Sequence, residues 1–399
     1  MNKPCILIIE TVLSGHRGEY VRWIVQGFLN KKYKVILALP ESELGHQSIC
    51  ELQHENFSFK SFEDDLLVEK IKWLTKFKLI SKDYMHYRLF KEVFNRVNIH
   101  ENVENVFIPF IDHALYSFSV FGSPFKKCRF SGISMRPDFH YTKIGVNAPE
   151  RKGANIKEWL FNRFLQIPTL RSLFTLDEAL AQYYKNTKYK KLIFLPEPAD
   201  FIKPVEGVIE KIKQELGIPS LIKTILVYGS LTSRKGIIIL LKTLLKFDSN
   251  YNFQVVLAGK TDGCVNKELQ KKEYISLLEN KRLIVIDRFI SSEEESVLFS
   301  IAYCCWLGYI GHFRASGVLI QSCKYNLPVL ATNEGIIGWQ VHKHNVGLPM
   351  NSSLIDSVYV AMKKMLSNNT DYQHYKNNTK NAFVENTLKN AQQIIVESI

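Results

Sequence analysis

The sequence lacks the features that define several protein classes. Its seven cysteines are an odd, scattered set without a Cys-x-x-Cys pair, which argues against a zinc ribbon and against a disulfide framework. No apolar run approaches the roughly 20 residues of a membrane-spanning helix. Residues 1–10 hold neither the long apolar run nor the cleavage site of a signal peptide. We therefore expect a cytoplasmic protein with buried thiols that at most lies on the inner face of the cytoplasmic membrane.

Acidic residues are too few to balance the basic ones. The formal net charge is +13, and the excess is spread over both halves of the chain. Such a field favours anionic partners: nucleotide phosphates, anionic lipid or nucleic acid. A generally basic, solvated surface explains the excess equally well. The sequence contains no nucleic-acid recognition motif, so we expect no specific nucleic-acid partner.

The composition and length predict two α/β domains. The chain has 399 residues with 46% hydrophobic content, enough for two cores of about 200 residues each. In the first half, a β-branched run at 5–9, an amphipathic helix at 20–30 and a strand at 34–39 form one βαβ unit. Later strands of that sheet are expected at 105–110, 130–134, 171–176 and 192–195.

Two prolines, Pro196 and Pro198, interrupt the pattern before a second series of strands and helices begins. Its strands are expected at 224–228, 253–258, 283–286, 304–307 and 328–331. Its helices are expected at 235–247, 293–299, 317–325 and 354–367, followed by one long helical tract at 371–398. The alternation predicts two doubly wound parallel sheets, one in a domain of residues 1–200 and one in a domain of residues 201–375.

The most informative stretch is 227–236, where a buried strand ends at Gly229 and a polar loop leads to Arg234, Lys235 and Gly236. Basic side chains at a helix start are poorly placed for the helix dipole alone, because that end is already positive. They suit a bound anion, held by backbone N–H groups and by the Lys235 ammonium. The alternative is a surface loop with two incidental cations. The anion hypothesis requires that Lys235 does not point into bulk solvent.

A second loop, 307–316, also follows a predicted strand and ends at the dipeptide Ser316-Gly317. Ser316 is expected to cap the next helix, and Gly317 would let a phosphate or sugar approach the backbone. Gln321 lies one helical turn further on and would face the same ligand. Capping alone for Ser316, and a solvent-facing position for Gln321, are the alternatives.

These stretches resemble the C-terminal domain of family 4, a large family of GT-B glycosyltransferases. The resemblance covers residues 224–350, with Gly229, Lys235 and Gly236 matching the loop that holds the donor diphosphate. Residues 255–259 match the central strand that ends in glycine, and 334–338 match the next glycine-rich turn. The resemblance implies two Rossmann-like domains facing across a cleft (GT-B), with a C-terminal helix, 376–399, that returns to the first domain. The implied donor-binding residues are Gly229, Ser230, Arg234, Lys235, His312, Ser316, Gly317, Val318, Gln321 and Glu334.

The sequence departs from the family pattern at three positions. Ser230 stands where an arginine is common, and Arg234 is the candidate to supply that charge. The two family glutamates that contact donor sugar and ribose are replaced by Phe313 and Gln321. Gln321 can still bond ribose hydroxyls, whereas Phe313 cannot replace a carboxylate. The departures indicate either a branch with other donor contacts, through His312, Arg314 or Glu334, or a loss of catalysis.

In the first domain, the turn after the first strand contains Gly15, His16, Arg17 and Gly18. In the resembling family this turn faces the cleft, which would allow Arg17 to neutralise the departing phosphate. Asp112 and His113 follow the predicted strand at 105–110, so His113 is a candidate to bond the donor sugar, with Asp112 orienting it or an acceptor hydroxyl. Arg136 and Asp138 are further candidates. A tight turn with exposed polar residues is the alternative for residues 14–19.

Two basic stretches carry aromatic residues. Residues 68–96 hold eight Lys or Arg against three acids, and 151–171 is similar. Both suit an anionic membrane surface, or ordinary helices that pack aromatics inward. The basic residues of the first stretch are Lys70, Lys72, Lys76, Lys78, Lys82, Arg88, Lys91 and Arg96, and its aromatic residues are Trp73, Phe77, Tyr84, Tyr87, Phe90 and Phe94. The aromatic residues of the second stretch are Trp159, Phe161 and Phe164.

The resemblance therefore implies a glycosyltransferase that moves a sugar from a nucleotide-diphosphate carrier, with retention, to a glycan or lipid-linked acceptor. Bacterial surface polysaccharide synthesis is the setting that the family suggests. No Asp-x-Asp motif accompanies the proposed site, so we expect no metal and no cofactor beyond the nucleotide-sugar co-substrate. The alternative is a non-catalytic nucleotide-sugar-binding or scaffold protein on a degenerate GT-B fold.

Overall fold

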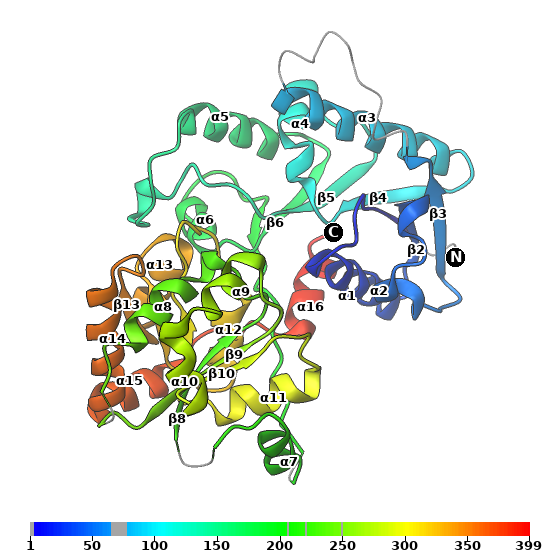
Figure 1. Cartoon of the computed structure of the whole chain (residues 1–399). Coiled ribbons are helices and arrows are strands. Elements are labelled where there is room, and N and C mark those ends of the chain that lie inside the picture. Colours follow the sequence, from blue (N-terminus) through cyan, green and yellow to red (C-terminus); the bar gives the residue numbers. More distant parts are fainter. Residues whose placement is uncertain (1–3, 65–77, 206, 220–221, 249) are drawn as a thin grey trace. The chain divides into compact units, whose positions relative to one another are not determined.

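The computed structural model describes residues 4–64, 78–205, 207–219, 222–248 and 250–399. They form two compact units, shown in Figure 1. Unit 1 comprises the described residues of Met1–His140, Glu150–Pro196 and Leu388–Ile399, and unit 2 those of Tyr141–Pro149 and Glu197–Thr387.

The sequence placed residues 141–149 and 376–387 differently from this division. Residues 141–149 belong to unit 2 although the predicted first domain ran from 1 to 200. Asn147 is the reason, because its carbonyl accepts from Gly335 N at 2.7 Å and its side chain donates to Asn333 O at 3.3 Å. Residues 376–387 also belong to unit 2.

The described part of unit 1 contains a seven-stranded, fully parallel sheet in the order β3-β2-β1-β4-β5-β6-β7. The order reverses between β1 and β4, which is the topological switch point where ligands bind in doubly wound sheets. β1 is buried along its whole length, as expected for a parallel strand covered on both faces. The strands are β1 (Cys5–Ile9), β2 (Lys34–Pro40), β3 (Phe57–Phe62), β4 (Val103–Ile108), β5 (Arg129–Ser134), β6 (Leu170–Thr175) and β7 (Leu192–Phe194).

Helices cover both faces of this sheet. Phe90 of α3 and Phe118 of α4 pack in the core on one face, together with Phe164 of α5. Phe28 of α1 and Ile395 of α16 pack on the other face. The helices of unit 1 within the described residues are α1 (His16–Asn30), α2 (Gln47–Cys50), α3 (Lys78–Asn98), α4 (Leu115–Phe121), α5 (Ala154–Leu165), α6 (Glu178–Tyr184) and α16 (Leu388–Glu397).

Unit 2 contains a second parallel sheet, with six strands in the described residues and the order β10-β9-β8-β11-β12-β13. Its switch point lies between β8 and β11, the two strands whose loops the sequence singled out. The two-sheet architecture confirms the predicted fold class. The strands are β8 (Lys223–Tyr228), β9 (Phe253–Ala258), β10 (Leu283–Ile286), β11 (Cys304–Leu307), β12 (Val329–Thr332) and β13 (Gly347–Met350).

Unit 2 has the same layering. Phe299 of α11 and Leu319 of α12 are buried on one face of the sheet, and Leu240 of α8 and Met362 of α14 on the other. Ser291 and Glu294 form a capping box at the start of α11. The helices are α7 (Val208–Glu215), α8 (Ile237–Leu244), α9 (Gly263–Leu269), α10 (Ile275–Glu279), α11 (Ser292–Ile301), α12 (Gly317–Lys324), α13 (Gly335–His344), α14 (Ile355–Ser367) and α15 (Asn369–Thr379).

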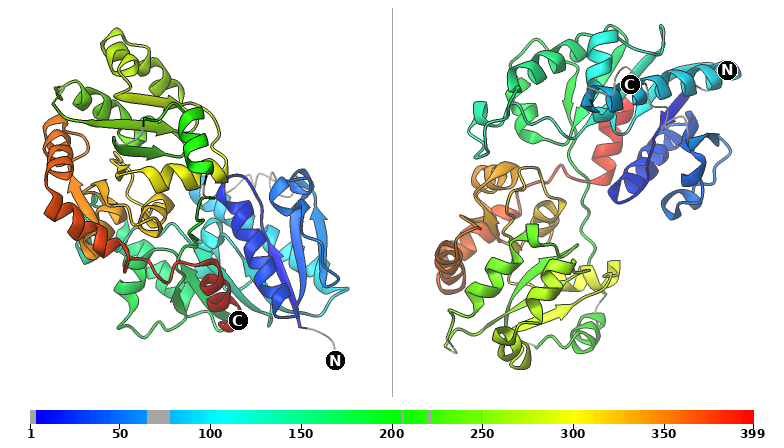
Figure 2. Two further views of the ribbon diagram at one scale, coloured as in Figure 1. Left: turned by 90° about the horizontal axis from the view of Figure 1, so that it is seen from below. Right: turned by 45° about the horizontal axis from the view of Figure 1, so that its top comes forward.

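The expected single helix at 371–398 is wrong, because the chain leaves the helical conformation between α15 and α16. Phe383 adopts φ 57° and is buried in the core of unit 2, whereas Ile395 is buried in the core of unit 1. One straight helix cannot bury apolar residues in two separate cores. α16 lies beside α1 in unit 1 (Figures 1 and 2), where Gln392 donates to Trp23 O at 2.8 Å.

Two edge strands, β3 and β13, were not predicted. Three of the six residues of β3 are exposed, and β13 has only four residues, one of them Pro349. Short or polar strands are typical of sheet edges, and their sequence signal is weak. None of the helices in the part of the chain that the structure describes is long and apolar enough to cross a membrane.

Candidate functional site

The loop after β8 folds back onto the end of its own strand. Residues Ser233–Lys235 form a 3₁₀ turn, and Gly236 (φ 68°) leads into α8. The Lys235 side chain is buried, and its ammonium donates a hydrogen bond to the Tyr228 carbonyl, the last of β8. Arg234 is exposed. Of the two predicted cations, Lys235 is therefore the buried one, held at the carboxyl edge of the sheet and not directed into bulk solvent.

The surroundings of Lys235 change the pKa of its ammonium. Burial lowers the pKa of Lys235 to about 8, with Cys305 acting in the opposite direction and Arg234 in the same one. An ammonium has three N–H donors, so Lys235 can bind an anion in addition to Tyr228 O. The Tyr309 ring centroid lies 5.9 Å from the ammonium.

Close backbone contacts make this arrangement dependent on glycine. A Cβ at Gly259 would lie 2.1 Å from Gly229 O, and a Cβ at Gly236 would lie 2.1 Å from Gly308 O. At Gly229 (φ 86°), a Cβ would lie 3.1 Å from the Lys235 ammonium. Glycine at these positions lets the loops after β8, β9 and β11 meet. Ser230, which lies between Gly229 and the 3₁₀ turn, is exposed.

The loop after β11 is held against the Lys235 turn. Trp306 donates from its indole to Lys235 O at 2.8 Å, and Ile310 N donates to Arg234 O at 2.8 Å. The rings of Tyr309 and His312 have centroids 4.9 Å apart. Burial lowers the pKa of His312, partly offset by its bond to Ala315 O, so its imidazole is neutral at neutral pH.

The helix α12 begins differently from the prediction. Ser316 is the N-cap residue, but its hydroxyl makes no capping bond and lies 3.3 Å from the Tyr309 hydroxyl. A Cβ at Gly317 would lie 3.4 Å from Glu197 Oε1, so a carboxylate of unit 2 already faces this helix start. A negative charge there is stabilised by the helix dipole. Val318 is half-buried against the core.

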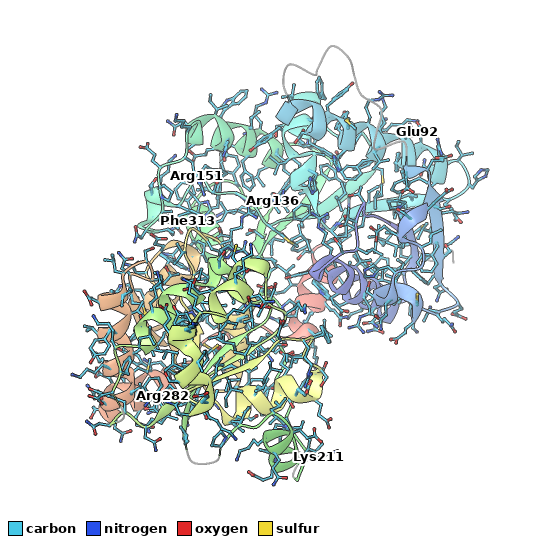
Figure 3. The ribbon with its side chains drawn as sticks, in the orientation of Figure 1. Glu92, Arg136, Arg151, Lys211, Arg282 and Phe313 are labelled. Carbon is cyan, nitrogen blue, oxygen red and sulfur yellow. The ribbon has the colours of Figure 1, made fainter. Side chains whose placement is uncertain are left out.

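Glu334 and Phe313 come together at the start of α13. A Cβ at Gly335 would lie 2.4 Å from the Phe313 Cα, and Ile336 N donates to Phe313 O at 3.0 Å. Figure 3 labels Phe313 in this loop. Glu334, the N-cap residue of α13, is half-buried. The structure thus places a carboxylate-bearing residue next to the position where the family glutamate is replaced by phenylalanine.

Gln321 does not point into open solvent. Its amide donates to Glu295 Oε1 at 3.3 Å, and the Tyr228 hydroxyl donates to Glu295 Oε2 at 2.7 Å. Glu295 comes from α11 and was not among the predicted site residues. A carboxylate therefore lies one hydrogen bond away from the position where the family pattern carries one. The run of acids at 293–295 was the only sequence signal, and it equally suits a helix start.

The predicted residues of unit 1 form a separate cluster. Arg17 contacts His113 Nε2 at 3.0 Å, and because a guanidinium has no acceptor, Nε2 accepts. The Arg17 guanidinium also lies over the Phe110 ring at 4.0 Å, with that of Arg136 at 4.7 Å from the same centroid. Arg136 is labelled in Figure 3. His113 stacks on His86 of α3, with ring centroids 4.8 Å apart.

Asp112 has structural partners. Its carboxylate accepts from the Ser134 hydroxyl and from Met135 N, both at 2.7 Å, which ties the loop after β4 to the end of β5. Burial raises its pKa. Arg17 is hydrogen-bonded to His113, and Asp112 holds the loop that carries His113. Asp138 pairs with Arg151 at 3.2 Å and with Lys157 at 3.3 Å.

The predicted glycine turn is the first turn of α1. Gly15 (φ 66°) is the N-cap, and His16 is already helical, although its side chain lies outside the described part of the structure. A Cβ at Gly18 would lie 2.2 Å from Ser48 Oγ, so this glycine permits the contact between α1 and α2. The helix starts four residues earlier than predicted, which places Arg17 on a rigid element.

Glu10 is a site residue that the sequence did not reveal. It follows β1 directly and is 3% exposed. Its Oε1 accepts from Thr11 N at 2.7 Å and lies 3.7 Å from the Arg17 guanidinium. Burial raises the pKa of Glu10 to about 7, opposed by Thr11 N and by Arg17. A single glutamate at a strand end carries no signal that distinguishes it from a surface residue.

The described residues contain no group of three His, Cys, Asp or Glu side chains that could hold a metal ion.

A known protein family and several solved structures resemble this chain. Residues 208–382 match the family model of glycosyl transferases group 1. A glycosyltransferase from Rickettsia africae aligns with 100% of this chain and 98% of its own, at a TM-score of 0.66 and 15% identity. The chain has the fold of the GT-B glycosyltransferases.

Other solved structures support the same fold. The sucrose-phosphate synthase of Thermosynechococcus elongatus gives a TM-score of 0.65 at 13% identity, with 99% of this chain and 98% of its own chain covered. Anabaena HepE in complex with UDP and glucose gives 0.63 at 12% identity, with 99% of both chains covered. A search of curated protein sequences finds no match to the chain.

The raised pKa of Glu10 predicts an inverted pH dependence for the stability of unit 1. Between about pH 4.5 and pH 7 the folded state holds a proton that the unfolded state releases, so the free energy of unfolding falls as pH rises. Glu10→Gln removes this dependence. The change in the free energy of unfolding that the substitution causes should therefore be on the order of 3 kcal/mol more favourable at pH 8 than at pH 4. The measurement is calorimetric unfolding against pH. Glu51→Gln, at an exposed position, is the control, and parallel pH profiles for wild type and Glu10→Gln would contradict the assignment.

Proposed function

We propose that this protein is a glycosyltransferase of the family 4 type, which moves a sugar from a nucleoside diphosphate sugar to a glycan or lipid-linked acceptor. The transfer proceeds with retention and without a metal, in the synthesis of a bacterial surface polysaccharide. The observation that carries the proposal is the buried ammonium of Lys235 at the carboxyl edge of β8. A buried cation at a switch point is suited to a diphosphate, whose charge it balances.

The diphosphate carries the leaving-group charge of the reaction. Its negative charge grows as the bond to the anomeric carbon breaks, so a fixed cation stabilises the transition state more than the ground state. Lys235 is held in place by Tyr228 O, and Arg234 adds an exposed cation on the same turn. HepE was solved with UDP and glucose, which supports a uridine diphosphate sugar as the first donor to test.

The sugar and ribose would be bound by groups that replace the two family glutamates. Glu334 lies beside Phe313 and offers a carboxylate to sugar hydroxyls, with the neutral His312 on the neighbouring loop. Glu295, held by Gln321 and Tyr228, offers a carboxylate to the ribose diol. Each of its oxygens has a second lone pair for a ribose hydroxyl. These relocated carboxylates favour an active branch of the family over a degenerate one.

In unit 1 we assign the substrate contacts to Arg17 and His113. Both side chains are fixed, Arg17 by Glu10 and Phe110 and His113 by stacking on His86. Asp112 acts as a positioning residue through Ser134 and Met135.

Replacing the buried ammonium tests the diphosphate site. Lys235→Met keeps the length of the side chain but removes the charge, and we expect UDP affinity to fall about 10- to 100-fold, as for a lost charge-assisted bond. Affinity for uridine should not change. Wild-type UDP affinity should also fall as the pH rises through 8, where Lys235 loses its proton. Calorimetric titration measures both. Lys242→Met, at an exposed position of α8, is the control, and an unchanged UDP affinity in Lys235→Met would refute the site.

Glu295 is tested by its selectivity for ribose. In the wild type, UDP should bind about tenfold more tightly than 2′-deoxy-UDP, because the deoxynucleotide leaves a carboxylate oxygen without its hydroxyl partner. Glu295→Gln should bring the ratio of the two affinities close to one. Glu293→Gln, in the exposed first turn of the same helix, should keep the wild-type ratio. If Glu295→Gln kept the wild-type ratio of the two affinities, the carboxylate would hold α12 in place without binding the ribose.

An apolar surface on unit 1 suits the proposed peripheral membrane location. Phe161 and Phe164 of α5, and Phe90 and Phe94 of α3, are buried in the core, so these aromatics pack inward. Lys70, Lys72, Trp73, Lys76 and Phe77 lie outside the described residues, as do the side chains of Lys78 and Lys82. The exposed apolar residues of the α4–α5 surface are Val120, Phe121, Ile156 and Trp159.

The α4–α5 surface also carries positive charge. The Arg163 guanidinium lies over the Trp159 ring at 5.0 Å and donates to Ser119 O at 3.1 Å. Lys126 and Lys127, in the loop after α4, are exposed. Aromatic residues beside cations favour the interface of an anionic bilayer.

Removing the apolar part of the α4–α5 surface tests the membrane proposal. We expect the double variant Ile156→Ser, Trp159→Ser to lose most of its co-sedimentation with vesicles that contain phosphatidylglycerol, since buried apolar area drives the insertion. Vesicles of phosphatidylcholine alone should bind neither protein. Val360→Ser, at an exposed position of unit 2, is the matched control. Equal vesicle binding by the double variant and the wild type would contradict the assignment.

A further inference from the structure

Unit 1 contains a pocket of about 230 Å³ at the carboxyl ends of three neighbouring strands. Glu10 follows β1, Phe110 lies two residues beyond β4, and Met135 follows β5. Arg17 and Tyr20 of α1 also line the pocket. The pocket is smaller than the roughly 300–1,000 Å³ of sites for drug-sized ligands, so it suits a single ring rather than an extended molecule.

One atom in this pocket lacks the partner that its burial requires. Among the residues that the structure describes, Glu10 Oε2 has no hydrogen-bond partner and is shielded from solvent. The other oxygen, Oε1, accepts from Thr11 N at 2.7 Å and from Val12 N at 3.4 Å. A buried carboxylate oxygen without a donor costs free energy, and nearly all such atoms in folded proteins find one. Above about pH 7, where Glu10 is ionised, a ligand or solvent that enters the pocket can supply the missing donor.

The charges around Oε2 restrict the class of ligand. Above about pH 7, where Glu10 is ionised, its carboxylate repels an anion, and an amine cation is repelled by Arg17, whose guanidinium lies 3.7 Å from Glu10 Oε1. Phe110 and Met135 make the remaining wall apolar. A neutral molecule that presents a hydroxyl to Oε2 satisfies all three conditions.

We propose that this pocket binds a neutral, monosaccharide-sized ring of the acceptor, and that a hydroxyl of that ring donates to Glu10 Oε2. The assignment of the ring to the acceptor rests on the proposed function. Glu10 then determines which sugar can enter, because a ring without a hydroxyl at the matching position leaves the buried oxygen unpaired. Such a loss is more costly than the absence of a contact at an exposed site.

The test uses the full-length protein with methyl glycosides of the common hexoses, each also in singly deoxygenated forms. Binding is measured by saturation-transfer NMR, and UDP binding is measured in parallel by calorimetry. We expect at least one glycoside to bind the wild type and to lose about tenfold or more of its affinity in Glu10→Gln. Deoxygenation at one ring position should reproduce that loss in the wild type and add nothing in Glu10→Gln, since both changes remove the same bond.

Two further proteins keep the test decisive. Ser14→Trp, at the exposed mouth of the pocket, should block the glycoside without altering Glu10, and it serves if Glu10→Gln does not fold. Glu51→Gln should bind as the wild type does. The inference is overturned if UDP binds but no glycoside does, or if glycoside affinity survives both pocket variants. Absence of UDP binding would instead refute the proposed function, so the two failures are separate.

Discussion

The proposed donor site depends on a buried ammonium held at the end of a strand. Lys235 can lie there because Gly229 leaves room for its ammonium and because Gly236 and Gly259 allow three loops to touch through their backbones. Tyr228 O and the Trp306 indole fix the turn on both sides. A charge removed from water without a full partner is costly. The same geometry allows the Lys235 ammonium to bind an anion strongly, because the ammonium is already removed from water when the protein folds.

Three carboxylates keep acidic groups near the positions where the chain departs from the pattern of the family that it resembles. Glu295 lies one bond from Gln321, Glu334 lies beside Phe313, and Glu197 faces the start of α12 at Gly317. Each comes from an element other than the one that carries the family pattern. Helices packed around one switch point offer several positions whose side chains reach the same space, so a carboxylate can move between elements. Motif comparison along the chain sees only the two substitutions.

The switch point of unit 1 carries an acidic side chain together with basic ones. Glu10, Arg17 and His113 form a chain of contacts around Phe110, and Asp112 is committed to holding the loop between β4 and β5. The raised pKa of Glu10 and the lowered pKa of Lys235 have the same cause, which is burial of a group that water would otherwise solvate. Perturbed groups at both switch points are consistent with functional sites in both units.

The sequence by itself determined the alternation of strands and helices, the two parallel sheets and the loop of Lys235, because these depend on local apolar runs and on glycine spacing. It could not determine the break between α15 and α16, which is forced when Phe383 and Ile395 enter different cores. Nor could it find Glu10 or Glu295, or show that Asp112 bonds Ser134. Those roles depend on which side chains from distant segments meet at a strand end. Only tertiary packing brings such segments together, so no spacing along the chain records it.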